Sequence, residues 1–268
     1  YRLFGRPEDK ATIDTSAASL ATRFRPSIKS IQSWDSSSRF KCPVIIDNMM
    51  NLELLCWASD NGADPKFKEI AITHANTAMK NQFRPDYSSF QVVDYDLETA
   101  GIHKKTKWQG VSDSSAWSRG QGWGLYGYVT MYRFTKDPEY LKQAKGIAKF
   151  ILNHPNLPED KIPYWDFDAP KVPNELRDAS AGALIASALL ELGQYSTKKE
   201  KKQFVGAAEK MIQSLSSDKY RAKLGENGGF LLMHSVGALP FNGEVDVPLT
   251  YTDYYFLEAL LRYKKWYI

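Results

Sequence analysis

The residue types best suited to chemistry gather in residues 116–124, where Trp117, Trp123 and Arg119 flank three glycines. Tryptophan faces stack on sugar rings, and the planar guanidinium of an arginine suits a carboxylate. Clustered glycines weaken a helix, which is tolerated where the backbone must approach something closely. The segment therefore predicts a site for an acidic sugar. The alternatives are tight helix packing around two core tryptophans and a surface salt bridge for Arg119.

Asp47 is a second candidate, because it is a single carboxylate at the end of an apolar run. An aspartate at this position can cap the helix that follows. It can also act as an acid, since apolar neighbours such as Val44, Ile46 and Met50 raise the pKa of a carboxyl group. A helix N-terminus favours the ionised form and burial favours the protonated form, so both roles remain open.

Four other aspartates lie beside aromatic residues or near expected helix starts, namely Asp166, Asp168, Asp178 and Asp253. An aspartate that opens a helix is usually a cap. A structural role is therefore favoured for each of them.

Helices must position these residues, because apolar side chains recur at helical spacing in about eight stretches. The stretches begin near Ala11, Asp47, Pro65, Arg119, Pro138, Arg177, Lys199 and Thr252. Two of the starts, Asp64-Pro65 and Asp137-Pro138, combine a capping aspartate with a proline whose missing N–H costs nothing in the first turn.

These two starts lie 73 residues apart, and the same shift aligns Phe67 with Tyr140 and Ala71 with Ala144. Asp-aromatic-Asp triplets follow at residues 94–96 and 166–168, an offset of 72. A long repeat without a linker predicts one domain, residues 1–268, in which helix pairs form an open solenoid or a closed ring. Long loops at residues 84–117, 154–176 and 218–250 favour a ring with one functional face.

Bulk properties exclude several function classes. The net charge is only +4, with no basic stripe, so nucleic acid is not an expected partner. The two cysteines and four histidines lack metal-ligand spacing, so neither a metal nor a cofactor is expected. No apolar run is long enough to span a membrane. Localisation, periplasmic or cytoplasmic, and oligomeric state remain open.

Taken together, the motifs resemble the unsaturated glucuronyl hydrolases of glycoside hydrolase family 88. The resemblance runs along nearly all of the chain, through VIIDN (44–48), WSRGQGWG (117–124), YWDF (164–167), RDAS (177–180) and DYYFLEAL (253–260). It implies an all-α fold, an (α/α)6 toroid of six helical hairpins. Twelve helices are then expected against about eight counted, so the toroid is expected to be incomplete at its N-terminus.

The resemblance also implies an activity, the removal of an unsaturated uronic acid from the non-reducing end of oligosaccharides that lyases produce. In that reaction Asp47 donates a proton to the C4=C5 enol ether and then helps a water add at C5. The family uses two aspartates, and the earlier one is expected before Tyr1. The resemblance therefore implies an unsaturated oligosaccharide as the partner of the protein.

Carried over residue by residue, the resemblance implies that substrate is bound by Trp34, Gln109, Trp117, Arg119 and Trp123. Family members commonly carry a histidine where this chain has Gln91. A glutamine can hydrogen-bond but cannot become charged, so an altered substrate preference or activity is expected.

Two alternative functions are considered. Unsaturated rhamnogalacturonyl hydrolases share the ring and the reaction, but typically show Arg-Gly-Asn where this chain has Arg119-Gly120-Gln121. A non-catalytic carbohydrate-binding helical scaffold would not bring Asp47, Gln109 and Arg119 to one cavity. The parent polysaccharide and its sulfation are not predicted.

Overall fold

Aspartates cap two of the helices whose starts the sequence predicts. Asp137 accepts a hydrogen bond from the Glu139 N–H at 2.9 Å, and Asp64 accepts one from the Lys66 N–H at 2.9 Å. Each carboxylate thus satisfies a first-turn N–H that has no partner inside the helix.

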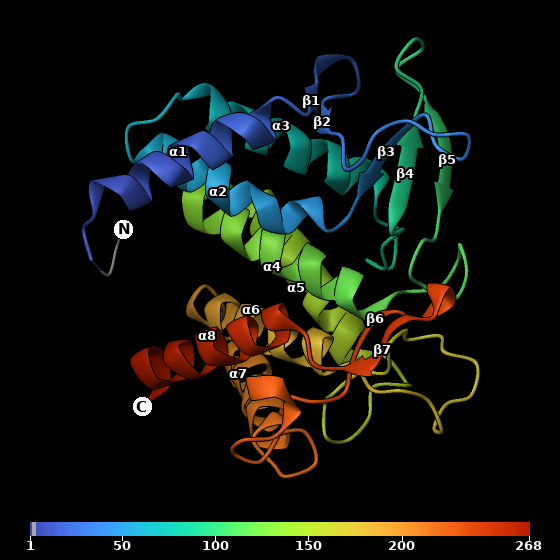
Figure 1. The fold of residues 1–268 in the computed structure, drawn as a ribbon, viewed down its shortest axis with the longest axis vertical. Helices are drawn as coiled ribbons and strands as arrows, with labels where there is room; N and C mark the ends of the chain where they lie inside the picture. Colours follow the sequence, from blue (N-terminus) through green and yellow to red (C-terminus); the bar gives the residue numbers. More distant parts are fainter. Residues whose placement is uncertain (2–3) are drawn as a thin grey trace.

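The computed structural model describes residue 1 and residues 4–268, and these residues contain eight α-helices (Figure 1). The helices are α1 (Pro7–Ala21), α2 (Asn48–Asp60), α3 (Lys66–Asn81), α4 (Ser118–Thr135), α5 (Pro138–Asn153), α6 (Ala179–Gln194), α7 (Lys198–Leu215) and α8 (Thr250–Tyr267). All eight stretches expected from apolar spacing are confirmed, with starts shifted by a few residues.

The helices form two layers. Helices α2, α4, α6 and α8 pack side by side in that order, and α3, α5 and α7 each pack against the preceding helix. Short turns join α2 to α3, α4 to α5 and α6 to α7 (Figure 1). This is the helix-pair repeat that the 73-residue offset predicts. Because each pair reverses direction, the four inner helices all run the same way.

Longer connections lie at the rim where the inner helices begin, and they carry the strands. The strands are β1 (Phe24–Arg25), β2 (Ser30–Ile31), β3 (Cys42–Ile45), β4 (Val92–Tyr95), β5 (Ile102–Thr106), β6 (Ser235–Ala238) and β7 (Gly243–Val247). They pair antiparallel as β1-β2, β3-β4-β5 and β6-β7, with Val44 opposite Val93. These small sheets lie at one end of the helical core.

The repeated Asp-aromatic-Asp triplets hold these loops to the rim. Asp94 accepts hydrogen bonds from the backbone N–H groups of Lys41 and Cys42 at 3.1 and 2.8 Å. Asp166 accepts one from the Val111 N–H at 2.9 Å, and both aspartates are fully buried. A buried carboxylate is stable when it accepts several such bonds. The structural role expected for Asp166 is therefore the one observed.

Glycines of α4 allow the inner helices to approach closely. A Cβ at Gly127 would lie 2.4 Å from Met49 Cβ of α2, and one at Gly122 would lie 2.8 Å from Leu184 Cδ2 of α6. The glycine-rich segment thus serves packing between α2, α4 and α6. This accounts for glycines that cost helix stability.

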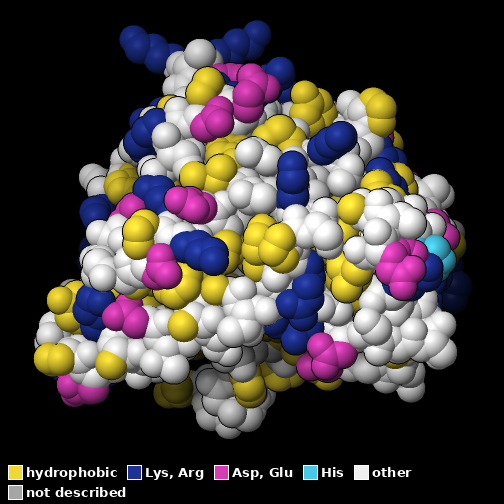
Figure 2. All heavy atoms as spheres, turned by 90° about the horizontal axis from the view of Figure 1, so that it is seen from above, with side chains coloured by type: hydrophobic (Ala, Val, Ile, Leu, Met, Phe, Trp, Pro, Cys, Tyr) yellow, Lys and Arg dark blue, Asp and Glu magenta, His cyan; other side chains and the backbone are white. Residues whose placement is uncertain are grey.

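Charged side chains of both signs are interspersed over the face shown in Figure 2. Among the described residues, no helix combines the length and the apolar character needed to cross a membrane.

Candidate functional site

The candidate site lies where the four inner helices begin. Asp47 immediately precedes α2, Arg119 lies in the first turn of α4, Asp178 precedes α6, and Tyr251 lies in the first turn of α8. The Arg119 guanidinium contacts Asp178 at 3.2 Å and lies 5.4 Å from the centre of the Tyr251 ring. Residues far apart in the sequence therefore meet because parallel helices start at one rim.

Asp47 faces a cavity of about 470 Å³ between α2, α4 and α8. Its walls include Trp34, Asn48, Trp123, Tyr251 and Tyr255. Asn48 is fixed by a 2.7 Å hydrogen bond from Nδ2 to the Ile31 carbonyl oxygen. The cavity combines one carboxyl group with several aromatic rings, the composition expected of a sugar site.

The two roles left open for Asp47 are separated by its geometry. The residue has helical backbone angles (φ −58°, ψ −29°), and its side chain makes no capping hydrogen bond to a described residue. Its Oδ2 atom is buried and has no hydrogen-bond partner within residues 1 and 4–268. The Asp47 carboxyl group therefore does not serve as the cap of α2, and the role of an acid is the one that this geometry leaves.

Burial raises the pKa of Asp47 from 3.8 to about 6, because desolvation penalises the ionised form. The positive charge of Arg119 opposes this shift, as do the Asp47 backbone N–H and the Trp123 indole N–H. The indole Nε1 nevertheless lacks full hydrogen-bond geometry with any described acceptor. Such a carboxyl group can hold a proton near pH 6, as a general acid must.

Arg119 is buried, and both of its terminal nitrogen atoms bond to protein oxygen atoms. Nη1 bonds to the Val236 carbonyl oxygen at 2.5 Å and to Asp178 at 3.2 Å, and Nη2 bonds to the Gly237 carbonyl oxygen at 2.8 Å. The sequence offered a surface salt bridge as an alternative for Arg119. The salt bridge that is observed, to Asp178, is buried, so that alternative is wrong about its location. Direct binding of a substrate carboxylate by Arg119 remains a prediction.

Gln109 and Arg119 both donate hydrogen bonds to the Gly237 carbonyl oxygen. Its Nε2 donates to the Gly237 oxygen at 2.7 Å, and its Oε1 accepts from Gln91 Nε2 at 2.7 Å. Gln91 Oε1 in turn accepts from the N–H groups of Trp108 and Gln109 at 2.9 and 2.6 Å. Gln91, which replaces a family histidine, thus holds Gln109 and the loop before α4 in place.

The three tryptophans expected at the site have different surroundings. Trp123 and Trp34 line the Asp47 cavity. Trp117 is only 3% exposed, and its ring is contacted by Arg119 at 4.5 Å and lies against Gly120. The alternative of tight packing therefore describes Trp117 in this structure, and sugar stacking on it remains a prediction.

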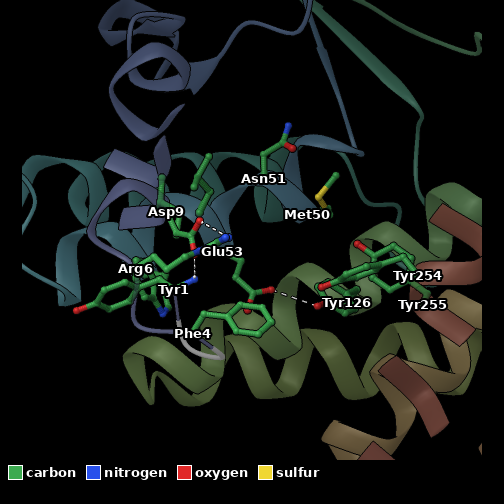
Figure 3. A pocket seen from close by; sticks show the side chains of 13 residues that line it. Tyr1, Phe4, Arg6, Asp9, Met50, Asn51, Glu53, Tyr126, Tyr254 and Tyr255 are labelled. Atoms are coloured by element: carbon green, nitrogen blue, oxygen red, sulfur yellow. Dashed lines mark hydrogen bonds and ion pairs between the residues drawn. The ribbon is translucent and has the colours of Figure 1, made fainter. Parts of the chain in front are cut away.

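A larger cavity of about 790 Å³ adjoins the Asp47 cavity, with Met50, Asn51, Tyr254 and Tyr255 shared between them (Figure 3). The Tyr126 hydroxyl donates toward Glu53 at 3.2 Å across its wall, between α4 and α2 (Figure 3). The open space beside Asp47 therefore continues along α2.

Sequence reasoning missed Tyr251 and Asn48. The pKa of Tyr251 is raised to about 12, chiefly by burial, with Arg119 opposing the shift and Asp178, Glu244 and Asp47 adding to it. The phenol is therefore protonated at neutral pH and lies within electrostatic reach of the carboxyl group. Its position in the first turn of an inner helix was the available signal.

Comparisons with known proteins agree with this architecture, although no family model matches the chain. A crystal structure of an unsaturated glucuronyl hydrolase specific for heparin superposes with a TM-score of 0.95 at 48% identity, covering 99% of this chain and 71% of that one. The fold class is thus the (α/α)6 toroid, of which the described residues provide eight helices.

Two sequence relatives define the family. An unsaturated glucuronyl hydrolase of Formosa agariphila is 47% identical over 254 residues, which cover 94% of this chain and 63% of the relative. An unsaturated chondroitin disaccharide hydrolase of Streptococcus pyogenes serotype M1 is 34% identical over 270 residues, covering 99% and 67%. The chain belongs to the unsaturated glucuronyl hydrolase family and spans about two thirds of the length of these relatives.

Proposed function

We propose that the protein is a glycoside hydrolase that removes the unsaturated uronic acid from the non-reducing end of lyase-generated oligosaccharides, by hydrating its C4=C5 enol ether. The observation that carries the proposal is the Asp47 carboxyl group. Asp47 is half-buried and lines an aromatic cavity, makes no cap to a described residue, and has its pKa raised to about 6 by desolvation. Family membership supports the same reading.

The chemistry requires one group that first gives and then takes a proton. Protonated Asp47 donates to C4, and the positive charge that develops at C5 is shared with the ring oxygen. A water then adds to C5 and passes a proton to the Asp47 carboxylate, which restores the acid. The resulting hemiketal opens to a ketone and releases the next sugar. Two carboxylates flanking the anomeric carbon, as in ordinary glycosidases, are not needed.

Other residues bind and position. Trp34 and Trp123 provide aromatic surface beside the unsaturated ring. Arg119 lowers the pKa of Asp47 and contributes positive potential near the uronate, while protein carbonyl groups hold its N–H donors. The second aspartate that the resemblance implies was expected before Tyr1, so no residue of this chain is assigned that role.

The test follows the ultraviolet absorbance of the C4=C5 bond in unsaturated disaccharides from glycosaminoglycan lyase digests. The proposal expects the absorbance to decay and a reducing sugar to appear in equal amount. An unsaturated galacturonyl-rhamnose disaccharide, tested alongside, would decay faster if the rhamnogalacturonyl alternative holds. Calorimetric binding of the disaccharides without any decay would instead identify a non-catalytic scaffold.

A further inference from the structure

Four aromatic rings in contact with one another lead out of the Asp47 cavity, and we call this cluster the rim platform; Phe40 is its buried member and Phe241 its exposed one. Its members are Trp34, Phe40, Trp108 and Phe241. Ring centres lie 5.7 Å apart for Trp34 and Trp108, and 4.7 Å apart for Trp108 and Phe241. Trp34 also lines the cavity, so the platform begins where the proposed reaction takes place.

An exposed arginine lies on this platform. The Arg39 guanidinium carbon is 4.6 Å from the centre of the Trp108 ring and 5.4 Å from that of Phe40. In the described part of the chain, no carboxylate or carbonyl group pairs with this guanidinium. Stacking on aromatic rings limits its motion and leaves its N–H edges in water.

The surroundings of Arg39 add positive charge. Lys104 Nζ donates to the Arg39 carbonyl oxygen at 2.5 Å and lies 4.7 Å from the centre of the Phe40 ring. The nearby carboxylate of Asp113 is already engaged by the Lys107 N–H at 2.9 Å and the Thr106 hydroxyl at 2.8 Å. Asp113 lies within electrostatic range of Arg39, but no described carboxylate bonds to the guanidinium, so the platform presents an oriented guanidinium whose N–H groups are open to an anion.

We propose that Arg39 on the rim platform binds an anionic group, a sulfate ester or a carboxylate, on the saccharide that leaves when the unsaturated uronate is removed. This inference rests on the proposed function and adds a determinant of substrate preference. The planar fork of a guanidinium pairs with such oxyanions through two parallel hydrogen bonds. Trp34 and Phe241 supply apolar surface for the sugar ring that carries the group.

Arg119, the basic group beside Asp47, does not offer the same recognition. Arg119 is buried and its Nη1 and Nη2 atoms bond to protein oxygen atoms, whereas Arg39 is exposed and stacked. An anion on the leaving saccharide therefore meets its directional donors outside the cavity, on the platform.

The experiment compares Arg39→Ala with the unchanged protein on two unsaturated disaccharides that differ only in a sulfate on the second sugar. A charge-assisted pair is worth about tenfold or more in affinity, so the ratio of kcat/KM for sulfated over unsulfated substrate should fall about tenfold, through KM. An unsulfated unsaturated tetrasaccharide, whose second uronate offers a carboxylate, distinguishes the two sources of the anion. Arg221→Ala, an exposed arginine paired with Asp218, is the matched control and should leave the ratio unchanged.

Arg39→Lys keeps the charge without the planar fork and should recover only part of the preference. A loss on the sulfated disaccharide alone would identify the sulfate, and a loss on the tetrasaccharide alone would identify the carboxylate. Equal effects of Arg39→Ala on all three substrates, or none on any of them, would overturn the inference. Binding measured by calorimetry with the same sugars gives a second readout that does not need turnover. If the unchanged protein hydrates no substrate, the proposed function fails, while the binding ratio still decides the role of Arg39.

Discussion

Asp47 Oδ2 and Trp123 Nε1 belong to the same cavity, and both atoms are buried without a hydrogen-bond partner of full geometry among the described residues. The indole N–H still lowers the pKa of the carboxyl group. The Trp123 N–H therefore faces the Asp47 carboxyl group across the start of α2 and favours its ionised form, against the effect of burial.

The pH dependence of activity should follow Asp47. A proton donor must be protonated, so kcat/KM should fall as the pH rises through about 6, the pKa of Asp47 in the free protein. Trp123→Phe removes the N–H that lowers this pKa and should move the falling limb to higher pH. Trp266→Phe is the control, because Trp266 lies in the last turn of α8, whereas the first turn of α8 lines the Asp47 cavity. An unmoved limb in Trp123→Phe would contradict the assignment.

The free energy of unfolding should also depend on pH, through the titration of the Asp47 carboxyl group. The pKa of Asp47 is raised on folding from 3.8 to about 6, so its contribution is complete below 3.8 and is lost as the pH rises to about 6. The Asp47→Asn variant does not lose stability in this way, because an asparagine side chain does not ionise. Its free energy of unfolding in urea should be close to that of the unchanged protein at pH 4, and exceed it by about 2 to 3 kcal/mol at pH 7. If the difference in free energy of unfolding between Asp47→Asn and the unchanged protein did not increase from pH 4 to pH 7, this assignment would be refuted.

The buried pair of Arg119 and Asp178 should be important for folding. The side chains are 4% and 0% exposed, and Asp178 also accepts from the Ser180 N–H at 3.0 Å. Asp178→Ala leaves a buried guanidinium without its charge partner and should cost about 3 to 5 kcal/mol in chemical denaturation. Asp218→Ala, which removes an exposed pair, should cost less than about 0.5 kcal/mol. Similar losses for both variants would contradict this assignment.

Close packing of α2 on α4 predicts a contrast between two glycines. Gly127→Ala places a methyl group 2.4 Å from Met49 Cβ and 2.9 Å from the Met49 carbonyl, so one helix must shift. The expected loss of stability is about 1 to 3 kcal/mol. A methyl group at Gly206 in α7 would meet nothing within 4 Å, and Gly206→Ala should stabilise by about 0.5 to 1 kcal/mol. Thermal unfolding of both variants checks this, and a Gly127→Ala protein as stable as wild type would disprove the packing argument.

Local signals were sufficient to predict the helices and their pairing. Capping aspartates, first-turn prolines and apolar spacing report on nearby backbone, and Asp137 is an observed cap of this kind. The rim strands were not predicted, because β3 and β4 are four residues each and depend on pairing across the chain.

The site was predicted only in part, because its chemistry depends on distant contacts. The sequence placed Asp47 at a helix start but could not decide between cap and acid, a choice set by backbone angles and burial. Tyr251 and Arg39 were missed, since the contact of each with the site crosses between loops and helices. Trp117 was expected to stack on a sugar. In the structure its ring packs against Gly120 and Arg119 instead.

The most direct test of the account is the rate at which Asp47→Asn hydrates an unsaturated disaccharide, followed by ultraviolet absorbance under single-turnover conditions. Asparagine keeps the shape of the side chain but has no proton to donate to C4. With Asp218→Asn as an exposed control, the account predicts a loss of about a hundredfold or more for Asp47→Asn, while substrate binding is retained. Decay as fast as in the unchanged protein would show that Asp47 is not the acid.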